Sequence, residues 1–242
     1  MVGEVRVTSL VERAVPQQRA QPVHVPDRAG VQARGPRHAR RPGPDDRFRV
    51  LVVCTGNICG SPAGELLMRH LLVGRLGGRA AGRVEVSSAG VRAVVGHGMH
   101  PLSRAQLAPW GLDSRADGFV ARQLDDAVVD GVDLVLGANV RHRSAVLERH
   151  PQLLDRTFAL REFARLSAAV DAASLPADLV GRGRALVEAA RALRGTVPPA
   201  DDTVPDPMGE PEQAHRDAVG LIFGAMHGIV DVLAPRQRVA AG

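Results

Sequence analysis

From Phe48 onward, short apolar runs alternate with longer segments in which apolar residues recur at helical spacing. The runs are too short for helices and rich in β-branched residues, which is typical of buried strands in a parallel sheet. Strands are expected at 48–53, 84–88, 132–136 and 157–160. Helices are expected at 61–75, 101–110, 137–149, 161–166, 176–193 and 212–233. This alternation predicts an α/β fold, a four-stranded parallel doubly wound sheet flanked by helices.

The first 47 residues have a different character. They are rich in Arg, Pro, Gln and Gly and show little apolar periodicity. Such a segment cannot bury enough apolar surface to offset the entropy of ordering. We therefore expect a disordered N-terminal extension over 1–47, a folded domain over 48–234 and a tail over 235–242; a basic arm that attracts acidic partners is the alternative for the extension.

Composition narrows the function classes. The net charge of +5 arises in the first 49 residues, which hold ten arginines and five acidic residues, while the rest is balanced. A basic nucleic-acid-binding domain is therefore not indicated. No apolar run reaches the length of about 18 residues that a membrane span needs, and no signal-peptide-like stretch opens the chain. The two cysteines cannot make a disulfide framework. These features predict a cytoplasmic protein; they leave the oligomeric state open.

The loop after the first strand carries the strongest chemical signal. The strand 48–53 delivers Cys54 to the edge of the sheet where open α/β folds bind ligands. The segment from Cys54 to Ser61 then turns into a helix, with Ser61 as a favourable N-cap and Pro62 at the first helical position. Backbone N–H groups in such a turn converge on an anion, and the same field favours a thiolate at Cys54. The alternative for Cys54 is a small buried apolar residue.

Several ordered motifs resemble those of the low-molecular-weight protein tyrosine phosphatases. The stretch 53–62, VCTGNICGSP, resembles the signature loop of that family, which is Cys, five residues, Arg, then Ser or Thr. Similar correspondence is found at 86–90, 121–124 and 133–136, and at 204–207, VPDP, the late loop that carries the family's general acid. The resemblance covers about 48–234.

The resemblance implies a hydrolase that works through a phosphocysteine intermediate. Cys54 would attack the phosphorus of a phosphomonoester, and Asp206 would protonate the leaving oxygen and then activate water. Asn57 would hold the shape of the loop, and Ser61 would hydrogen-bond the thiolate. Phosphate would be bound by residues Thr55, Gly56, Asn57, Ile58, Cys59, Gly60 and Ser61. No metal or organic cofactor is implied, and the partner would be a phosphotyrosyl protein or a small phosphomonoester.

Two positions depart from the family pattern. The loop arginine falls at position 60, which is Gly60, so a bidentate phosphate contact that stabilises the transition state is missing. Met208 stands where the family usually has an aromatic residue beside the acid. Ile58, in contrast, matches the tyrosine-phosphatase branch, since the arginine-phosphatase branch carries Thr there. Other arginines lie near the predicted sheet-end loops, and the sequence favours none of them: Arg92, Arg122 and Arg161.

The remaining candidates have ordinary interpretations beside functional ones. Cys59 is either a partner for a reversible disulfide with Cys54 or a small residue packed under the loop. The histidines at 97 and 100 offer too few ligands for a metal and are interpreted as surface loop. Asp201 and Asp202 are interpreted as solvated turn residues.

Three functions therefore stay open. The first is a phosphatase impaired at Gly60. The second is an inactive pseudophosphatase that binds a phosphorylated or acidic partner. The third is a cysteine enzyme that has been repurposed for a non-phosphate substrate.

Overall fold

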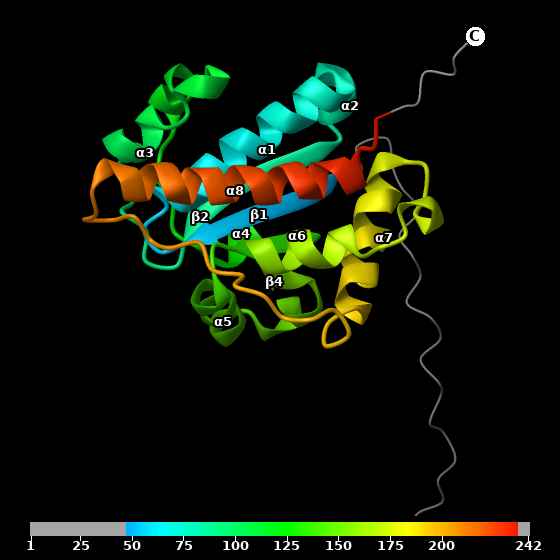
Figure 1. The fold of residues 1–242 in the computed structure, drawn as a ribbon. Helices are drawn as coiled ribbons and strands as arrows, with labels where there is room; N and C mark the ends of the chain where they lie inside the picture. Colours follow the sequence, from blue (N-terminus) through cyan, green and yellow to red (C-terminus); the bar gives the residue numbers. More distant parts are fainter. Residues whose placement is uncertain (1–46, 237–242) are drawn as a thin grey trace, which may run out of the picture. The chain divides into compact units, whose positions relative to one another are not determined.

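The computed structural model describes residues 47–236 and shows a four-stranded parallel sheet covered by helices (Figure 1). The strands are β1 (Phe48–Cys54), β2 (Val84–Gly90), β3 (Leu134–Gly137) and β4 (Thr157–Ala159). Their order in the sheet is β2-β1-β3-β4, and all three strand pairs are parallel. The chain winds outward in opposite directions from β1 and β3, so the predicted doubly wound α/β class is confirmed.

Eight α-helices connect and cover the strands within the described residues. Their bounds are α1 (Gly60–Leu76), α2 (Gly78–Ala81), α3 (Pro101–Ala105), α4 (Asp126–Val129), α5 (Val140–Arg149), α6 (Leu160–Ala168), α7 (Leu179–Ala192) and α8 (Glu212–Leu233). Short 3-10 turns lie between them at Ala108–Trp110, Ser114–Gly118, Pro151–Arg156 and Ala172–Ser174. The helix expected at 101–110 is therefore divided into α3 and the 3-10 turn Ala108–Trp110. Gly111 ends that turn with a φ of 65°, in the left-handed region that favours glycine.

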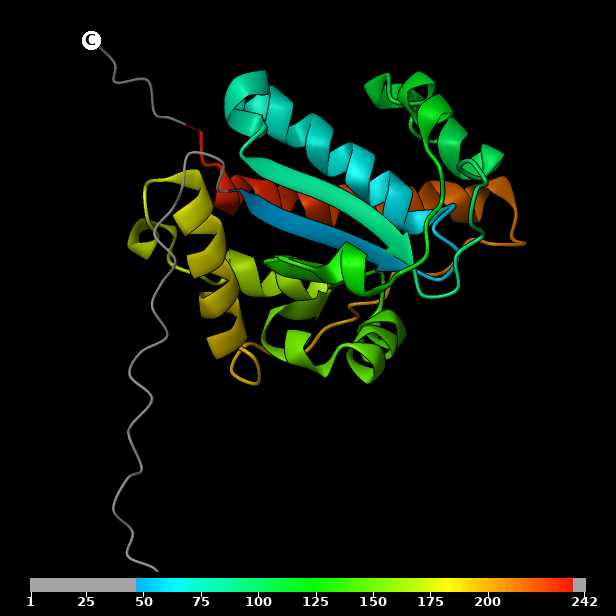
Figure 2. The same ribbon diagram turned by 180° about the vertical axis from the view of Figure 1, so that it is seen from behind.

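Side chains of β1 point alternately into two apolar clusters, one on each face of the sheet. Val50 and Val52 join the larger cluster with residues of α1, α6, α7 and α8. Leu51 and Val53 join the smaller one with residues near α4 and α5. Figures 1 and 2 show α8 lying along one face of the sheet and α1 beside it. The near-continuous burial of β1 follows from this double cover.

The predicted N-terminal extension, domain boundaries and C-terminal tail are not tested by the described residues. Residues 1–46 and 237–242 lie outside the described residues, and the expected disordered extension over 1–47 with them. The fold begins with β1 at Phe48, and α8 ends at Leu233. The domain boundaries at 48 and 234 stay a prediction. No helix within 47–236 combines the length and apolar character required to cross a bilayer.

Candidate active site

A cavity of about 180 Å³ lies at the carboxyl ends of β1 and β3, the two strands from which the chain winds in opposite directions. Open α/β sheets bind their ligands at this point. The cavity is lined by the loop after β1, the segments after β2 and β3, and the loop before α8. The lining residues are Cys54, Thr55, Gly56, Ile58, Cys59, Gly60, Arg92, Val94, Ala138, His142, Val204, Pro205, Asp206, Pro207 and Met208. Cys54 and Asp206, 152 positions apart in the sequence numbering, thus share one cavity.

Hydrogen bonds to its carbonyl groups orient the backbone of the loop after β1. Four of these carbonyls accept hydrogen bonds from backbone N–H groups of the segment after β2. The pairs are Val91 to Cys54 (3.0 Å), Arg92 to Thr55 (2.9 Å), Val94 to Gly56 (2.9 Å) and His100 to Ile58 (2.7 Å). In a planar trans peptide the N–H points opposite to the C=O, so the following amides face away from that segment.

These amides have no partner of their own. Within residues 47–236, no hydrogen bond is donated by the backbone N–H groups from Thr55 to Gly60. Free N–H groups in succession, next to the N-terminus of α1, create a concave site for an anion. The expected cradle is therefore compatible with the backbone geometry, although its role in binding phosphate stays a prediction.

Asn57 holds the loop in an unusual conformation. Its φ is 56°, the only positive φ of a non-glycine residue in the described part of the chain, and Asn tolerates this region better than most residues. The fully buried side chain donates from Nδ2 to Ser61 Oγ (2.9 Å) and to Ser88 Oγ (3.0 Å). Its Oδ1 accepts from the backbone N–H of Arg122 (2.9 Å). Asn57 thus ties the loop to β2 and to the segment before α4.

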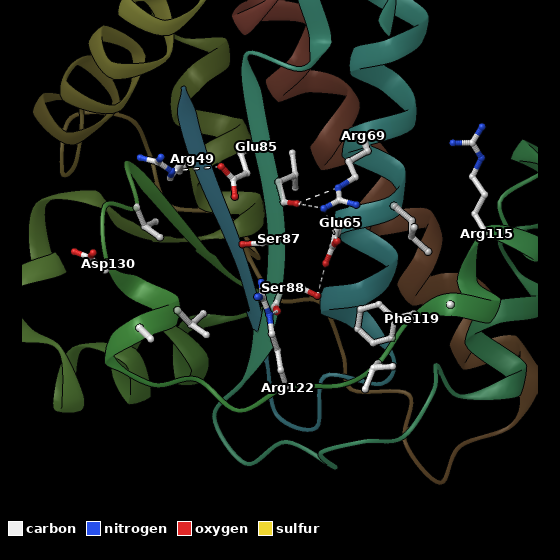
Figure 3. Close-up of a pocket in the computed structure, with 17 residues that line it drawn as sticks. Arg49, Glu65, Arg69, Glu85, Ser87, Ser88, Arg115, Phe119, Arg122 and Asp130 are labelled. Carbon is white, nitrogen blue, oxygen red and sulfur yellow. Dashed lines mark hydrogen bonds and ion pairs between the residues drawn. The ribbon is translucent and has the colours of Figure 1, made fainter. Parts of the chain in front are cut away.

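A second layer of polar contacts supports Asn57 from behind. Ser88 donates to Glu65 of α1 (2.7 Å), and Arg122 donates from Nε to the Ser88 carbonyl (2.7 Å). Figure 3 shows these side chains along β2, in a larger groove of about 600 Å³. Cys54 does not line that groove. The groove therefore holds the side chains that support the loop and not Cys54.

Ser61 does not cap α1, but it makes the contact with the Cys54 sulfur that the family resemblance implies. The helix α1 begins at Gly60 with Cys59 as its N-cap, and no side chain caps it, so the expected capping by Ser61 is wrong. Ser61 is fully buried, and its hydroxyl lies 2.9 Å from Cys54 Sγ and 3.3 Å from the carbonyl of Ala89. A hydroxyl has one proton to donate, and Asn57 already donates to this oxygen. Either the hydroxyl or the Cys54 thiol can be the donor in their contact, and the hydroxyl is also placed to donate to the Ala89 carbonyl.

Position 60 has room for a side chain. A Cβ built on Gly60 would meet only the Cδ1 of Ile222, at an ordinary 3.7 Å. Of the three arginines near the sheet ends, Arg92 alone lines the cavity. Its side chain is exposed and makes no hydrogen bond or ion pair within residues 47–236. Arg122 is bound to Ser88, and Arg161 donates to the carbonyl of Thr203.

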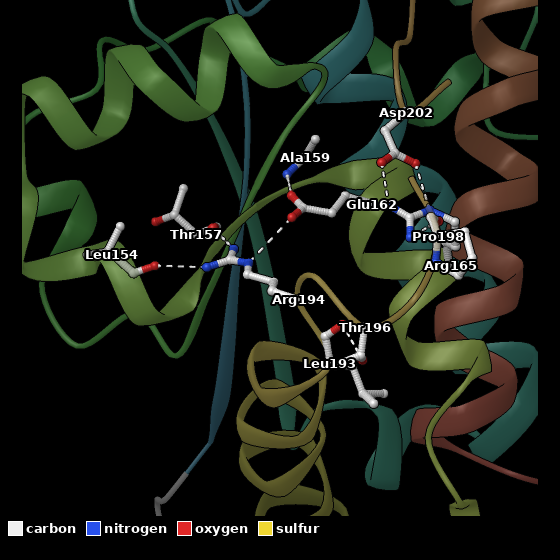
Figure 4. Close-up of polar contacts among 10 residues, drawn as sticks. All are labelled: Leu154, Thr157, Ala159, Glu162, Arg165, Leu193, Arg194, Thr196, Pro198 and Asp202. Carbon is white, nitrogen blue, oxygen red and sulfur yellow. Dashed lines mark hydrogen bonds and ion pairs between the residues drawn. The ribbon is translucent and has the colours of Figure 1, made fainter. Parts of the chain in front are cut away.

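The loop that carries Asp206 is anchored by a partly buried ion pair. Arg165 of α6 donates from Nη2 to Asp202 Oδ2 (2.6 Å) and from Nη1 to the Pro198 carbonyl (2.8 Å), as Figure 4 shows. The Asp202 side chain is only 14% exposed, so its interpretation as a solvated turn residue is wrong. Asp206 itself is exposed, and its Oδ1 accepts from the backbone N–H of Met208 (3.1 Å).

His142 is a site residue that the sequence did not indicate. It lies in the first turn of α5, which Asn139 caps, and its Nε2 is 2.9 Å from Thr55 Oγ1. Burial lowers the pKa of His142, with Asp206 opposing that effect and Arg92 adding to it. The ring is therefore neutral near pH 7. The sequence held no signal for it, because only the fold brings α5 beside the loop.

Cys59 is buried, which agrees with its interpretation as a small packed residue, whereas His100 differs from its expected surroundings. Both cysteines are free and buried, and burial raises the pKa of Cys59 to about 11. His97 is exposed, as expected for a surface loop. His100 is half-buried and lies beside Cys59 and His215 of α8, so its interpretation as a surface residue is wrong. The sequence could not pair His100 with a residue 115 positions away.

Comparison with known proteins places this site in a family. A sequence model described as "Low molecular weight phosphotyrosine protein phosphatase" matches residues 49–176. A probable low molecular weight protein-tyrosine-phosphatase, EpsP, of Ralstonia nicotianae is 32% identical over 120 residues, which are 50% of this chain and 75% of EpsP. A protein-arginine-phosphatase of Geobacillus stearothermophilus is 34% identical over 117 residues, 48% of this chain and 71% of that protein.

Solved structures agree on the fold. The tyrosine phosphatase AmsI of Erwinia amylovora superposes with a TM-score of 0.55 at 20% identity, covering 76% of this chain and 92% of AmsI. The chain belongs to the low molecular weight phosphotyrosine protein phosphatase family. The family match ends at residue 176, before the loop that carries Asp206.

Proposed function

We propose that the protein hydrolyses phosphomonoesters, with phosphotyrosyl side chains as the substrate class, through a phosphocysteine intermediate on Cys54. The observation that carries this proposal is the orientation of the loop after β1. Its carbonyls face the segment after β2, and its free amides and the Cys54 sulfur border the cavity that Asp206 also lines. Preorganised amide donors of this kind stabilise charge that develops on transferring oxygens.

The proposed reaction has two steps. The Cys54 thiolate forms a bond to phosphorus while the bond to the leaving oxygen breaks, and Asp206 gives its proton to that oxygen. Asp206 then takes a proton from water as the water oxygen displaces the Cys54 sulfur, releasing phosphate and restoring the thiolate. The Ser61 hydroxyl, 2.9 Å from the sulfur, stabilises the thiolate before attack and after release. No metal or organic cofactor takes part.

Gly60 sets the expected rate. Loss of one donor to a transition-state oxyanion typically costs about 100–1000-fold in rate, and a guanidinium provides two such contacts. We propose that Arg92, whose guanidinium is free of partners within the described residues, supplies part of the missing positive charge at the mouth of the cavity. Because it approaches from the segment after β2 and not from the loop, we expect partial compensation and a slow enzyme.

The wall of the cavity favours an aryl phosphate. Ile58, Val94 and Met208 give it an apolar side, and Val94 and Met208 are exposed at 37% and 48%. An aromatic ring can pack against such a surface, and methionine sulfur makes favourable contacts with ring edges. A phosphoarginine guanidinium would instead need acceptors on this wall. Relatives of both kinds exist, so this preference is a prediction to be tested by direct comparison of the two substrates.

The test is hydrolysis of para-nitrophenyl phosphate and of a phosphotyrosyl peptide by the full chain. We expect slow turnover that Cys54→Ser abolishes and Asp206→Asn reduces. Gly60→Arg should raise kcat/KM by about 100-fold or more, because the space at Gly60 admits the side chain and the donor is restored. If the activity of Gly60→Arg is no higher than the background rate without enzyme, the proposal is contradicted.

The two competing functions give different results. A pseudophosphatase would bind the phosphotyrosyl peptide without turnover, and Gly60 is the observation that favours it. A repurposed cysteine enzyme would show neither turnover nor peptide binding, but iodoacetate would still alkylate Cys54 at neutral pH.

A further inference from the structure

Three side chains that can bind a metal meet beside the loop after β1. Cys59 comes from that loop, His100 from the segment before α3 and His215 from α8. Their ligating atoms all lie within 4.8 Å of one another. Cys59 is 5% exposed and His215 is fully buried. None of the three side chains takes part in the proposed phosphatase chemistry.

The hydrogen bonding of the two histidines leaves one nitrogen of each ring without a partner. Within the described residues, neither His100 Nδ1 nor His215 Nε2 has one, although both atoms are buried. His215 Nδ1 lies 2.7 Å from the Oγ of Ser103. Which atom donates in this bond depends on the tautomer of His215. When Nδ1–H donates to the Ser103 oxygen, Nε2 carries the free lone pair, as in histidines that bind metals.

An imidazole binds a metal in the plane of its ring, so an ion shared by the two histidines requires the His100 ring to turn out of its stack on His215. The rings of His100 and His215 are nearly parallel, with centroids 4.8 Å apart and an interplanar angle of 12°. Bonds of 2.0–2.1 Å to nitrogen and 2.3 Å to sulfur place tetrahedral zinc ligands about 3.3–3.6 Å apart. Atoms at the 4.8 Å limit would therefore have to close by about 1.2–1.5 Å, and rotation of the half-buried His100 side chain would have to supply this movement.

The chemistry of the donors selects the ion. One thiolate with two imidazoles suits Zn²⁺, whereas Mg²⁺ and Ca²⁺ require oxygen ligands. Three protein ligands leave the fourth position to water.

We propose that Cys59, His100 and His215 form a zinc site that joins the loop after β1 to α8 and to the segment before α3. On binding, zinc displaces the thiol proton of Cys59 to solvent and forms a Zn–S bond. The ion thereby holds Cys59 away from disulfide formation with Cys54. It also places positive charge one residue from Gly60. This site does not depend on the proposed hydrolase activity.

The experiment uses the full chain, freed of metal with a chelator and titrated with Zn²⁺ by calorimetry and metal analysis. We expect one ion per chain, and with Co²⁺ as the probe a thiolate-to-cobalt charge-transfer band. Cys59→Ser, His100→Gln and His215→Gln should each weaken binding by at least about 100-fold, since loss of a ligand costs at least as much as loss of its support. Zinc should raise the Tm of the unmodified chain but not that of Cys59→Ser.

Matched controls separate this site from the neighbouring nucleophile. Cys54→Ser keeps the other thiol, and His97→Gln removes the exposed histidine three residues before His100, so both should bind zinc unchanged. Circular dichroism checks that each variant folds; if His215→Gln does not, the half-buried His100 carries the test. The proposal is overturned if zinc fails to bind stoichiometrically, or if binding is lost in Cys54→Ser and kept in Cys59→Ser.

Discussion

The substitution Gly90→Ala tests whether the close approach of β2 shapes the loop after β1. Gly90 is the last residue of β2, and the substitution adds one methyl group. A Cβ at this position would lie 2.6 Å from the Thr55 carbonyl oxygen, 2.9 Å from the Asn57 nitrogen and 3.1 Å from the Ala93 Cα. All three atoms belong to the backbone, so no side chain can rotate away. Restoring an ordinary contact of about 3.4 Å to Thr55 requires the loop to move by about 0.8 Å, with an overpacking cost of about 1–3 kcal/mol.

Such a movement should affect the chemistry more than the fold. A misplacement of about 1 Å at a reacting group can cost about 100-fold in rate. We therefore expect Gly90→Ala to lower kcat/KM for para-nitrophenyl phosphate by about that factor while the chain still unfolds cooperatively. The rate of Cys54 alkylation by iodoacetate, measured in a Cys59→Ser background, provides a readout that does not need turnover, and it should change as well.

Gly98→Ala is the matched control. Gly98 lies in the segment after β2, and a Cβ there would meet only the Phe119 carbonyl, at 3.8 Å. This variant should retain the activity, alkylation rate and free energy of unfolding of the unmodified chain. If Gly90→Ala behaves like Gly98→Ala in all three measurements, then close approach of β2 does not shape the loop, and the reasoning is refuted.

Three further results are expected. Arg92→Gln should lower kcat/KM for an aryl phosphate by about 10–100-fold, the usual effect of losing a charged hydrogen bond. The control is Arg141→Gln, because Arg141 is exposed and does not line the cavity, and this variant should keep the kcat/KM of the unmodified chain. Equal effects of the two substitutions would contradict a specific role of Arg92. Burial lowers the pKa of His142, so as the pH decreases the unfolded chain is protonated at this histidine before the folded chain. At pH values below 6.5 the free energy of unfolding should therefore decrease by up to about 1.4 kcal/mol per pH unit. His142→Gln should reduce this pH dependence in urea unfolding, and an unchanged pH dependence would contradict the role of His142. Asp202→Asn should loosen the loop before α8 and lower kcat more than it changes KM, and an unaffected kcat would show that the Arg165 ion pair does not position Asp206.

The apolar pattern predicted the fold because a strand such as β1, which is buried on both faces of the sheet, requires apolar residues at nearly every position. The resulting continuous run of β-branched residues is typical of a parallel sheet covered on both faces. Cys54 was expected at the sheet edge from its position at the end of that run, whereas Asp206 was assigned only from the resemblance of the VPDP segment to the family's late loop. The structure places both residues in the lining of one cavity. Local patterns of this kind depend on neighbours in sequence, and they transfer directly to the folded chain.

Contacts between distant segments were not predictable in the same way. Ser61 looked like a helix cap because its sequence context is that of a cap, and this prediction is wrong. Its contact with Cys54 was expected only from the family resemblance, and its contact with the Ala89 carbonyl was not expected at all. His142 and His215 sit on helices whose sequences only show amphipathic spacing. Which residue of the opposite element each one meets depends on how α5 and α8 pack against the sheet, and a single sequence does not contain that information.

The phosphocysteine itself is the most direct test of the proposed function. The Asp206→Asn variant, which lacks the base for the second step, is mixed with ³²P-labelled aryl phosphate and quenched in acid, and the labelled peptide is mapped. We predict a label on Cys54 that approaches one phosphoryl group per chain and is absent from Cys54→Ser. Absence of label from Cys54, or label on any other residue, would contradict the account.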